Sequence, residues 1–194
     1  IIILKLYLSK LINIQSRVVI YKILLEFLNT KKQFKLILNK HLSQKSCKDK
    51  NFITALSYGT IEKFYLLNYK IEQFSKFKNN NKTTSILLLS TYQIMFMKSI
   101  PEYAIVHSAV EISKLYTPTK SAFINAILRK ILSNKEFSDI DFCIRYSYPK
   151  WLYNKFLIQH GKINSHNIIK WFDINRTLWI RCINTRTKNN IINP

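Results

Sequence analysis

Apolar residues recur at helical spacing along most of the chain, and short polar segments separate one helical stretch from the next. The segment that follows Ser16 places Val19, Ile23 and Phe27 on one stripe, which predicts an amphipathic helix. A polar break at residues 29–32 ends that helix, and a second short helix follows it.

The middle of the chain predicts a central helix with other helices around it. Residues 51–77 form a long helical stretch, with Asp49 before it as a candidate N-cap. Gly59 lies inside this stretch, and a glycine there costs about 1 kcal/mol relative to alanine, so we expect close packing or a kink. The segment SILLLSTYQIMFMKS is apolar on all sides, which is typical of a buried central helix. A helix that starts at Pro101 comes next, and then KSAFINAILRKIL, whose predicted buried face is Ile124, Ile127, Leu128 and Ile131.

The composition changes after Ser133. Residues 134–141 are polar and predict a linker, and beyond them a helix begins at Pro149 and ends at Gly161. A shorter helix at about residues 165–172 precedes TLWIRCI, whose alternation predicts a strand. The expected fold class is therefore all-α, an antiparallel helical bundle followed by a small α/β connecting segment.

The few glycines, cysteines and histidines of the chain exclude several classes of protein. The chain has two glycines, Gly59 and Gly161, whereas an all-β or dinucleotide-binding protein of this length needs many more for its turns and phosphate loops. The three cysteines are far apart and form no C-x-x-C pair, and the four histidines show no ligand spacing, so neither a disulfide framework nor a metal site is expected. This cysteine usage favours a reducing, cytoplasmic location. The apolar start of the chain is short and interrupted by lysines, so we expect no membrane association.

The charge points to a polyanionic partner. Lysine and arginine number 31 against 10 acidic residues, which gives a formal net charge of +21. A surface this cationic attracts nucleic acid above all. Richness in Ile, Lys and Asn is also typical of compositional drift in an AT-rich genome, but drift does not explain the shortage of acidic residues.

Five segments, in chain order, carry a family resemblance: NFITALSYGTIEKFYLLNYKIEQF, STYQIMFMKSIPEYAIVHSAVEISK, AFINAILRK, YSYPKWL and LWIRCINTRT. Together they resemble the N-terminal half of ribosomal RNA small-subunit methyltransferase B, the Sun or Fmu family of cytosine-5 methyltransferases. The first three also resemble NusB, the transcription antitermination factor, because both families share one helical domain. The last two segments do not belong to NusB and favour the methyltransferase.

The resemblance implies a NusB-like helical RNA-binding domain at residues 16–137. It also implies an N-terminal extension at residues 1–15, and a connecting subdomain with the start of the methyltransferase half at residues 138–194. The family's reaction needs a glycine-rich loop for S-adenosylmethionine and a nucleophilic cysteine that follows a proline. This chain has neither Gly-x-Gly nor Pro-Cys, so we expect no catalytic residue and no cofactor site in it; S-adenosylmethionine is implied only for the full-length family. The expected function is to position small-subunit ribosomal RNA for methylation by a catalytic domain outside this chain.

Six basic residues are the candidate RNA contacts, by resemblance or by position: Arg17, Lys31, Lys32, Arg129, Lys130 and Arg181. For each of them an ordinary solvated charge or a structural ion pair is the alternative. We expect Asn125 to be a buried amide that bonds backbone, and Tyr58, Tyr92 and Tyr103 to be core aromatics with a hydroxyl at the surface.

Two other functions stay open from the sequence. A free-standing NusB-type protein would join an antitermination complex on nascent RNA, and it would not need the segment from Tyr146 onward. The second alternative is the product of a decaying gene, which the AT-like composition keeps open. The sequence leaves open the target cytosine and the oligomeric state.

Overall fold

The computed structural model describes residues 2–30, 32–44, 49–75, 80–137 and 139–174, with the backbone alone for residues 2–13. Over these residues the chain is helical and contains no strand. The chain divides into two compact units, residues 1–152 and residues 153–194. The helices are α1 (Ile2–Asn29), α2 (Phe34–Leu42), α3 (Lys50–Glu62), α4 (Phe64–Glu72), α5 (Asn81–Phe96), α6 (Glu102–Tyr116), the 3-10 turn η1 (Pro118–Lys120), α7 (Ser121–Ser133), α8 (Phe142–Arg145) and α9 (Lys150–Asp173).

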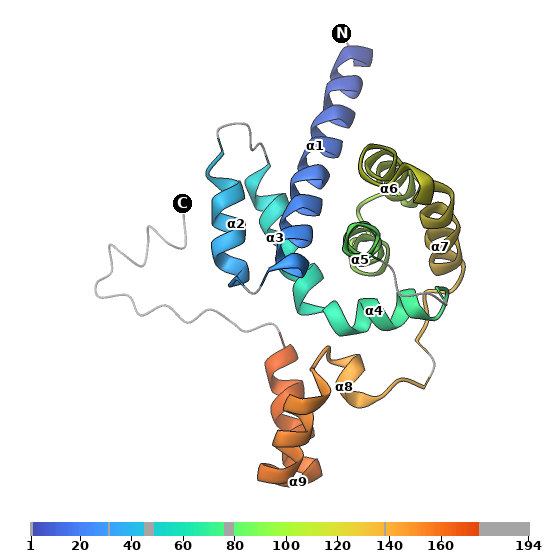
Figure 1. Cartoon of the computed structure of the whole chain (residues 1–194). Coiled ribbons are helices and arrows are strands. Elements are labelled where there is room, and N and C mark those ends of the chain that lie inside the picture. Colours follow the sequence, from blue (N-terminus) through green and yellow to red (C-terminus); the bar gives the residue numbers. More distant parts are fainter. Residues whose placement is uncertain (1, 31, 45–48, 76–79, 138, 175–194) are drawn as a thin grey trace, which may run out of the picture. The chain divides into compact units, whose positions relative to one another are not determined.

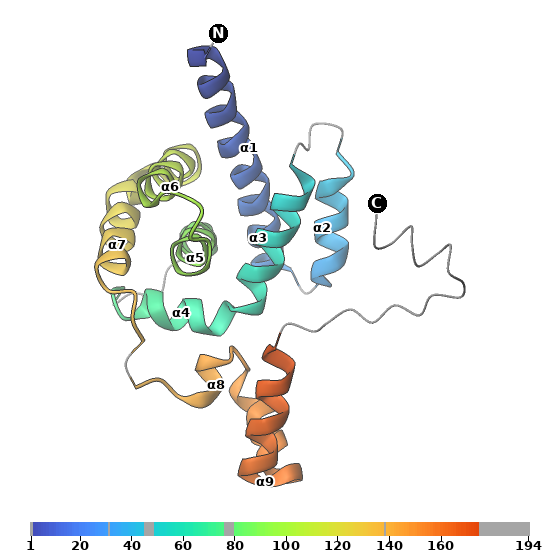
Figure 2. The ribbon, with the colours of Figure 1, turned by 180° about the vertical axis from the view of Figure 1, so that it is seen from behind.

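The helix α5 is the centre of the first unit. The Asn80 side chain caps its start by accepting a hydrogen bond from the Thr83 amide at 2.8 Å. Figures 1 and 2 show α1 and α3 on one side of α5 and α6 and α7 on the other, and α5 contacts all four helices. The all-round apolar pattern therefore predicted the central helix correctly.

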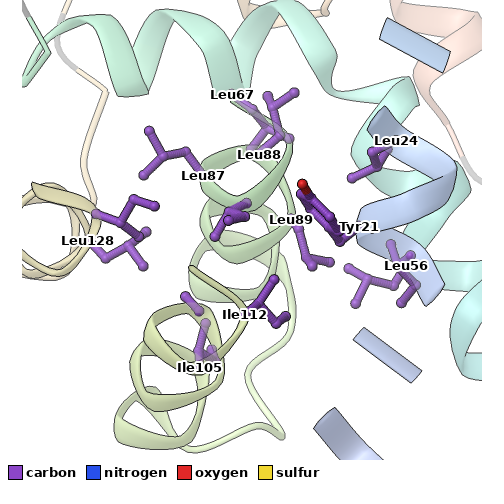
Figure 3. Close-up of a cluster of buried hydrophobic side chains, with 14 of the residues drawn as sticks. Tyr21, Leu24, Leu56, Leu67, Leu87, Leu88, Leu89, Ile105, Ile112 and Leu128 are labelled. Carbon is purple, nitrogen blue, oxygen red and sulfur yellow. The ribbon is translucent and has the colours of Figure 1, made fainter. Parts of the chain in front are cut away.

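Successive leucines of α5 fill different parts of the core. Consecutive residues of a helix point about 100° apart, because one turn takes 3.6 residues. In Figure 3, Leu87 lies on the side of Leu128 of α7, Leu88 lies on the side of α4, and Leu89 lies near Tyr21 of α1. All five side chains are almost completely buried. One helix thus ties together elements that are far apart in the sequence.

The predicted helix at residues 51–77 is two helices, because the backbone turns at Lys63 (φ −95°, ψ 20°). Gly59 lies before this turn and allows close packing: a Cβ there would lie 2.1 Å from the Tyr92 hydroxyl oxygen on α5. Asp49 precedes α3 in a left-handed conformation and makes no capping bond with its side chain. Its carboxylate instead accepts a hydrogen bond from the Ser16 hydroxyl at 3.2 Å.

A buried lysine fixes the chain that leaves α7. Lys70 of α4 has no exposed surface, and its ammonium group donates to the Glu136 carbonyl oxygen at 2.7 Å. The same group lies 3.4 Å from Asn134 Oδ1 and 5.1 Å from the centre of the Phe137 ring. Burial lowers the pKa of Lys70. Part of the polar segment that was predicted as a linker is therefore held against the bundle.

Two predictions concern the ends of the chain: the N-terminal extension and the α/β connecting segment. The helix α1 begins at Ile2, inside the predicted extension; the domain boundaries at residues 15 and 137 stay predictions. The regular structure in the described part of the connecting segment is the two helices α8 and α9, without a strand, so the expected α/β character is not seen there. The predicted strand at residues 177–183 lies outside the described residues.

In the second unit, α9 forms two helical arms, one before Gly161 and one after it. The helix α9 turns sharply at Gly161, whose φ of 71° and ψ of 171° suit glycine and agree with the predicted helix end. The Ser165 hydroxyl donates to the Gly161 carbonyl oxygen at 2.6 Å. Tyr153 and His166 join the two arms through a hydrogen bond of 2.8 Å between the hydroxyl oxygen and Nε2.

Candidate nucleic-acid interface

The helix α7 presents basic side chains to solvent. The apolar face predicted from its sequence is buried, as expected. Arg129 and Lys130 are exposed on the opposite side. Lys130 follows Phe123 by seven residues, so both lie on one stripe of the helix about 10 Å apart. The exposed Lys120 of η1 lies over the Phe123 ring at 5.7 Å, and this basic and aromatic pair was not predicted from the sequence.

The helices α6 and α7 run antiparallel and form a groove. Glu102, at the start of α6, forms an ion pair with Lys135, just after α7. At the other end, the Ser113 hydroxyl donates to the Ser121 hydroxyl at 2.7 Å. Figures 1 and 2 show the two helices side by side. The groove has a volume of about 520 Å³, and its lining includes Arg129.

Polar side chains of the groove are organised by hydrogen bonds. Arg129 Nε donates to Asn125 Oδ1 at 3.3 Å, so the half-buried Asn125 orients an arginine and does not have the buried, backbone-bonding role that we expected. Lys114 donates to the Glu111 carboxylate at 2.8 Å. That bond, more than the nearby charges of Lys114 and His107, lowers the pKa of Glu111. The carboxylates of Glu102 and Glu111 are thus both paired with lysines.

Tyr103 stands at the edge of this groove with 74% of its surface exposed. The prediction that it is a core aromatic is wrong. Tyr92, for which the same role was predicted, is partly buried and packs against the core beside Gly59. Tyr58 falls between these cases, because it is 43% exposed and its ring lies 5.2 Å from that of Phe34.

Arg17 lies inside the bundle and not at its surface. It is 2% exposed, its Nε donates to Gln93 Oε1 at 2.8 Å, and its guanidinium lies over the Phe52 ring at 5.6 Å. Burial lowers the pKa of Arg17 to about 10, so the side chain stays charged at neutral pH. These contacts join α1, α3 and α5, and a side chain so enclosed does not meet RNA phosphates.

One of the three remaining candidates lies within the described residues. Lys32 is exposed between α1 and α2, whereas Lys31 and Arg181 lie outside the described residues. The described part of the chain contains no group of three or more histidine, cysteine, aspartate or glutamate residues that could hold a metal ion. Nor does any described helix combine the length and the apolar character that crossing a membrane would require.

Comparison with known proteins identifies the family of this bundle. The sequence model of the NusB family matches residues 14–133, and the chain belongs to that family. A crystal structure of the antitermination factors NusB and NusE in complex with dsRNA contains a chain with the same fold. The match has a TM-score of 0.59 at 16% identity, and it covers 63% of this chain and 96% of that one.

Curated relatives of two kinds match about equally well. The probable ribosomal RNA small subunit methyltransferase B of Bacillus subtilis is 30% identical over 126 residues, which are 60% of this chain and 28% of that protein. The transcription antitermination protein NusB of Clostridium novyi is 32% identical over 127 residues, which are 61% of this chain and 96% of that protein. The chain thus spans little more than a quarter of the methyltransferase and nearly all of the free-standing NusB.

Proposed function

We propose that this chain is an RNA-binding domain that uses the exposed basic side of α7. The observation that carries the proposal is the arrangement of Lys120 over Phe123, with Arg129 and Lys130 exposed further along the same helix. Lysine and arginine bind RNA phosphates, and aromatic rings stack with bases. The net charge of +21 adds a long-range attraction for RNA, and the chain belongs to a family in which one solved structure is a complex with dsRNA.

We propose further that the RNA is small-subunit ribosomal RNA, and that this domain positions it for a methyltransferase. The support is the part of the chain that follows the family match. A free-standing NusB is almost fully covered by 127 matched residues, yet α8 and α9 extend this chain beyond residue 133. The segment Tyr146–Leu152, which runs from the end of α8 into the start of α9, resembles the methyltransferase family. The methyl transfer itself, with S-adenosylmethionine, belongs to the catalytic part of the full-length family.

The second candidate is a free-standing antitermination protein of NusB type. It is favoured by the identity of 32% to the Clostridium novyi protein, which is slightly higher than the 30% identity to the methyltransferase. The reading frame after the codon for Pro194 in the transcript separates the two functions. A frame that encodes a glycine-rich loop and a Pro-Cys dipeptide supports the methyltransferase, and a stop codon at that point supports the antitermination protein.

Paired substitutions test RNA binding by α7. We expect the double variant Arg129→Ala/Lys130→Ala to bind a small-subunit ribosomal RNA fragment more weakly, because two phosphate contacts are lost. Each lost contact should reduce the slope of log affinity against log salt by about 0.7–0.9. The matched control is Lys22→Ala/Lys82→Ala, which removes two exposed lysines from α1 and α5. Equal losses in both double variants would show that only the total charge matters, and would refute the assignment to α7.

A further inference from the structure

One end of the groove between α6 and α7 offers an aromatic face. Tyr103, Val106 and Val110 follow one another at helical spacing along α6, so they lie on one stripe of that helix. Because the helices are antiparallel, Leu132 near the end of α7 lies at the Tyr103 end of the groove. A large ring that is 74% exposed beside aliphatic side chains is a surface on which a flat apolar group can stack.

The other polar side chains of the groove suit a nucleotide. Asn125 holds Arg129 by its Nε atom, and the terminal amino groups of the guanidinium remain as donors in a fixed fork. Such a fork matches two phosphate oxygens. His107 lies one helical turn from Tyr103, and an imidazole on the groove wall can hydrogen-bond the edge of a base.

Volume and charge favour a nucleotide over a protein helix. The volume of about 520 Å³ falls within the range of small-ligand sites, about 300–1,000 Å³. The two glutamates of the groove are each paired with a lysine, so Arg129 adds a positive charge that they do not cancel. The chain as a whole carries a net charge of +21, which repels most basic peptides and attracts RNA.

We propose that this groove binds one unpaired nucleotide of the bound RNA, with its base stacked on Tyr103 and its phosphate on Arg129. The inference rests on the proposed RNA-binding function and adds to it the kind of RNA that is recognised. A base can reach Tyr103 only when it is not stacked within a helix, so the domain prefers an RNA loop or bulge to an uninterrupted duplex.

The test uses the 194-residue chain and two RNA probes that carry the same number of phosphates. One is a hairpin with an unpaired loop that contains photoreactive iodinated uridine, and the other is a fully paired duplex. Tyr103→Ala should weaken binding to the hairpin by about tenfold, the loss expected for one stacked base, and should leave binding to the duplex within about twofold. Tyr65→Ala, which removes an exposed tyrosine from α4, is the control and should change neither affinity.

Irradiation of the hairpin complex should attach the loop uridine to the peptide that contains Tyr103. Crosslinks elsewhere, or an equal effect of Tyr103→Ala on both probes, would overturn the assignment of the groove while leaving RNA binding intact. If the wild-type chain binds neither probe at low salt, the proposed function itself fails, and the groove inference fails with it. Circular dichroism of the Tyr103→Ala variant should show that the fold is kept, as expected for a side chain that is 74% exposed.

Discussion

Gly59→Ala tests the packing of the bundle, because its effect on the free energy of unfolding should change sign when Tyr92 is removed. A Cβ added there would lie 2.1 Å from the Tyr92 hydroxyl oxygen and 2.3 Å from the ring carbon that bears it. Both distances are far below van der Waals contact, so the Tyr92 ring or α3 must move. Overpacking of this kind costs about 1–3 kcal/mol.

The same substitution also has a favourable effect. Alanine within a helix is about 1 kcal/mol more stable than glycine. Gly59→Ala should therefore lower the free energy of unfolding by up to about 2 kcal/mol in the wild-type background. In a Tyr92→Ala background the clash is gone, and Gly59→Ala should raise the free energy of unfolding by about 1 kcal/mol.

Urea unfolding of the four proteins, followed by circular dichroism, measures both changes in one double-mutant cycle. The coupling energy between the two positions should be about 1–3 kcal/mol. If Gly59→Ala stabilises the wild-type background as much as the Tyr92→Ala background, the close approach of α3 and α5 is refuted.

Three further predictions concern other contacts. Arg17→Ala should lower the free energy of unfolding by about 1.5–3 kcal/mol, because it removes a buried charged hydrogen bond to Gln93. The control variant Lys130→Ala, at the surface, should change the free energy of unfolding by no more than about 0.5 kcal/mol. Urea unfolding of both variants measures these changes, and equal effects would contradict the burial of Arg17. Burial places the pKa of Lys70 in the folded chain below its ordinary value of 10.5 in the unfolded chain. Between the folded and the unfolded pKa, the unfolded chain binds more protons than the folded chain, so the free energy of unfolding rises with pH. Lys70→Met should reduce that rise when unfolding is measured from about pH 8 to pH 10.5, and identical pH profiles of the two proteins would argue against a buried Lys70. Gly161→Ala should destabilise the second unit by about 1–3 kcal/mol through backbone strain alone, since nothing lies within 4 Å of the added Cβ and its φ of 71° with ψ of 171° is a conformation that essentially only glycine adopts; hydrogen exchange of α9 measures the change, and unchanged protection in Gly161→Ala would count against this backbone conformation.

The sequence predicted those elements whose residues repeat a local pattern. The apolar residues of α5 surround the helix, so burial on all sides follows from the sequence itself. The buried face of α7 likewise follows from a spacing of three and four residues. The sequence also indicated close packing or a kink at Gly59, and the structure shows the packing; the partner, Tyr92, is 33 residues away and only the fold brings it close.

Features that depend on distant partners could not be predicted in the same way. Arg17 is buried because Gln93, 76 residues later in the chain, accepts its hydrogen bond. One local signal did exist: Arg17 precedes the buried Ile20, Tyr21 and Leu24 by three, four and seven residues, which places it on the core stripe of α1. A charged residue on such a stripe is a candidate for a satisfied internal cation.

The candidate site shows the same division. The exposure of Arg129 and Lys130 follows from the helical pattern of α7, so the sequence was sufficient to predict it. The groove depends on the antiparallel pairing of two helices, and no local pattern shows that Tyr103 faces solvent while Tyr92 packs inside. Lys120 was missed because its contact with Phe123 depends on the turn η1 at the start of α7.

Salt-dependent RNA binding tests the central claim most directly. The measurement is the affinity of the chain for a small-subunit ribosomal RNA fragment at several salt concentrations between about 50 and 200 mM. If the domain binds RNA through phosphate contacts of its basic side chains, log affinity should fall linearly with log salt, by about 0.7–0.9 per contact. Absence of binding at about 50 mM salt, or an affinity that does not change with salt, would contradict the account.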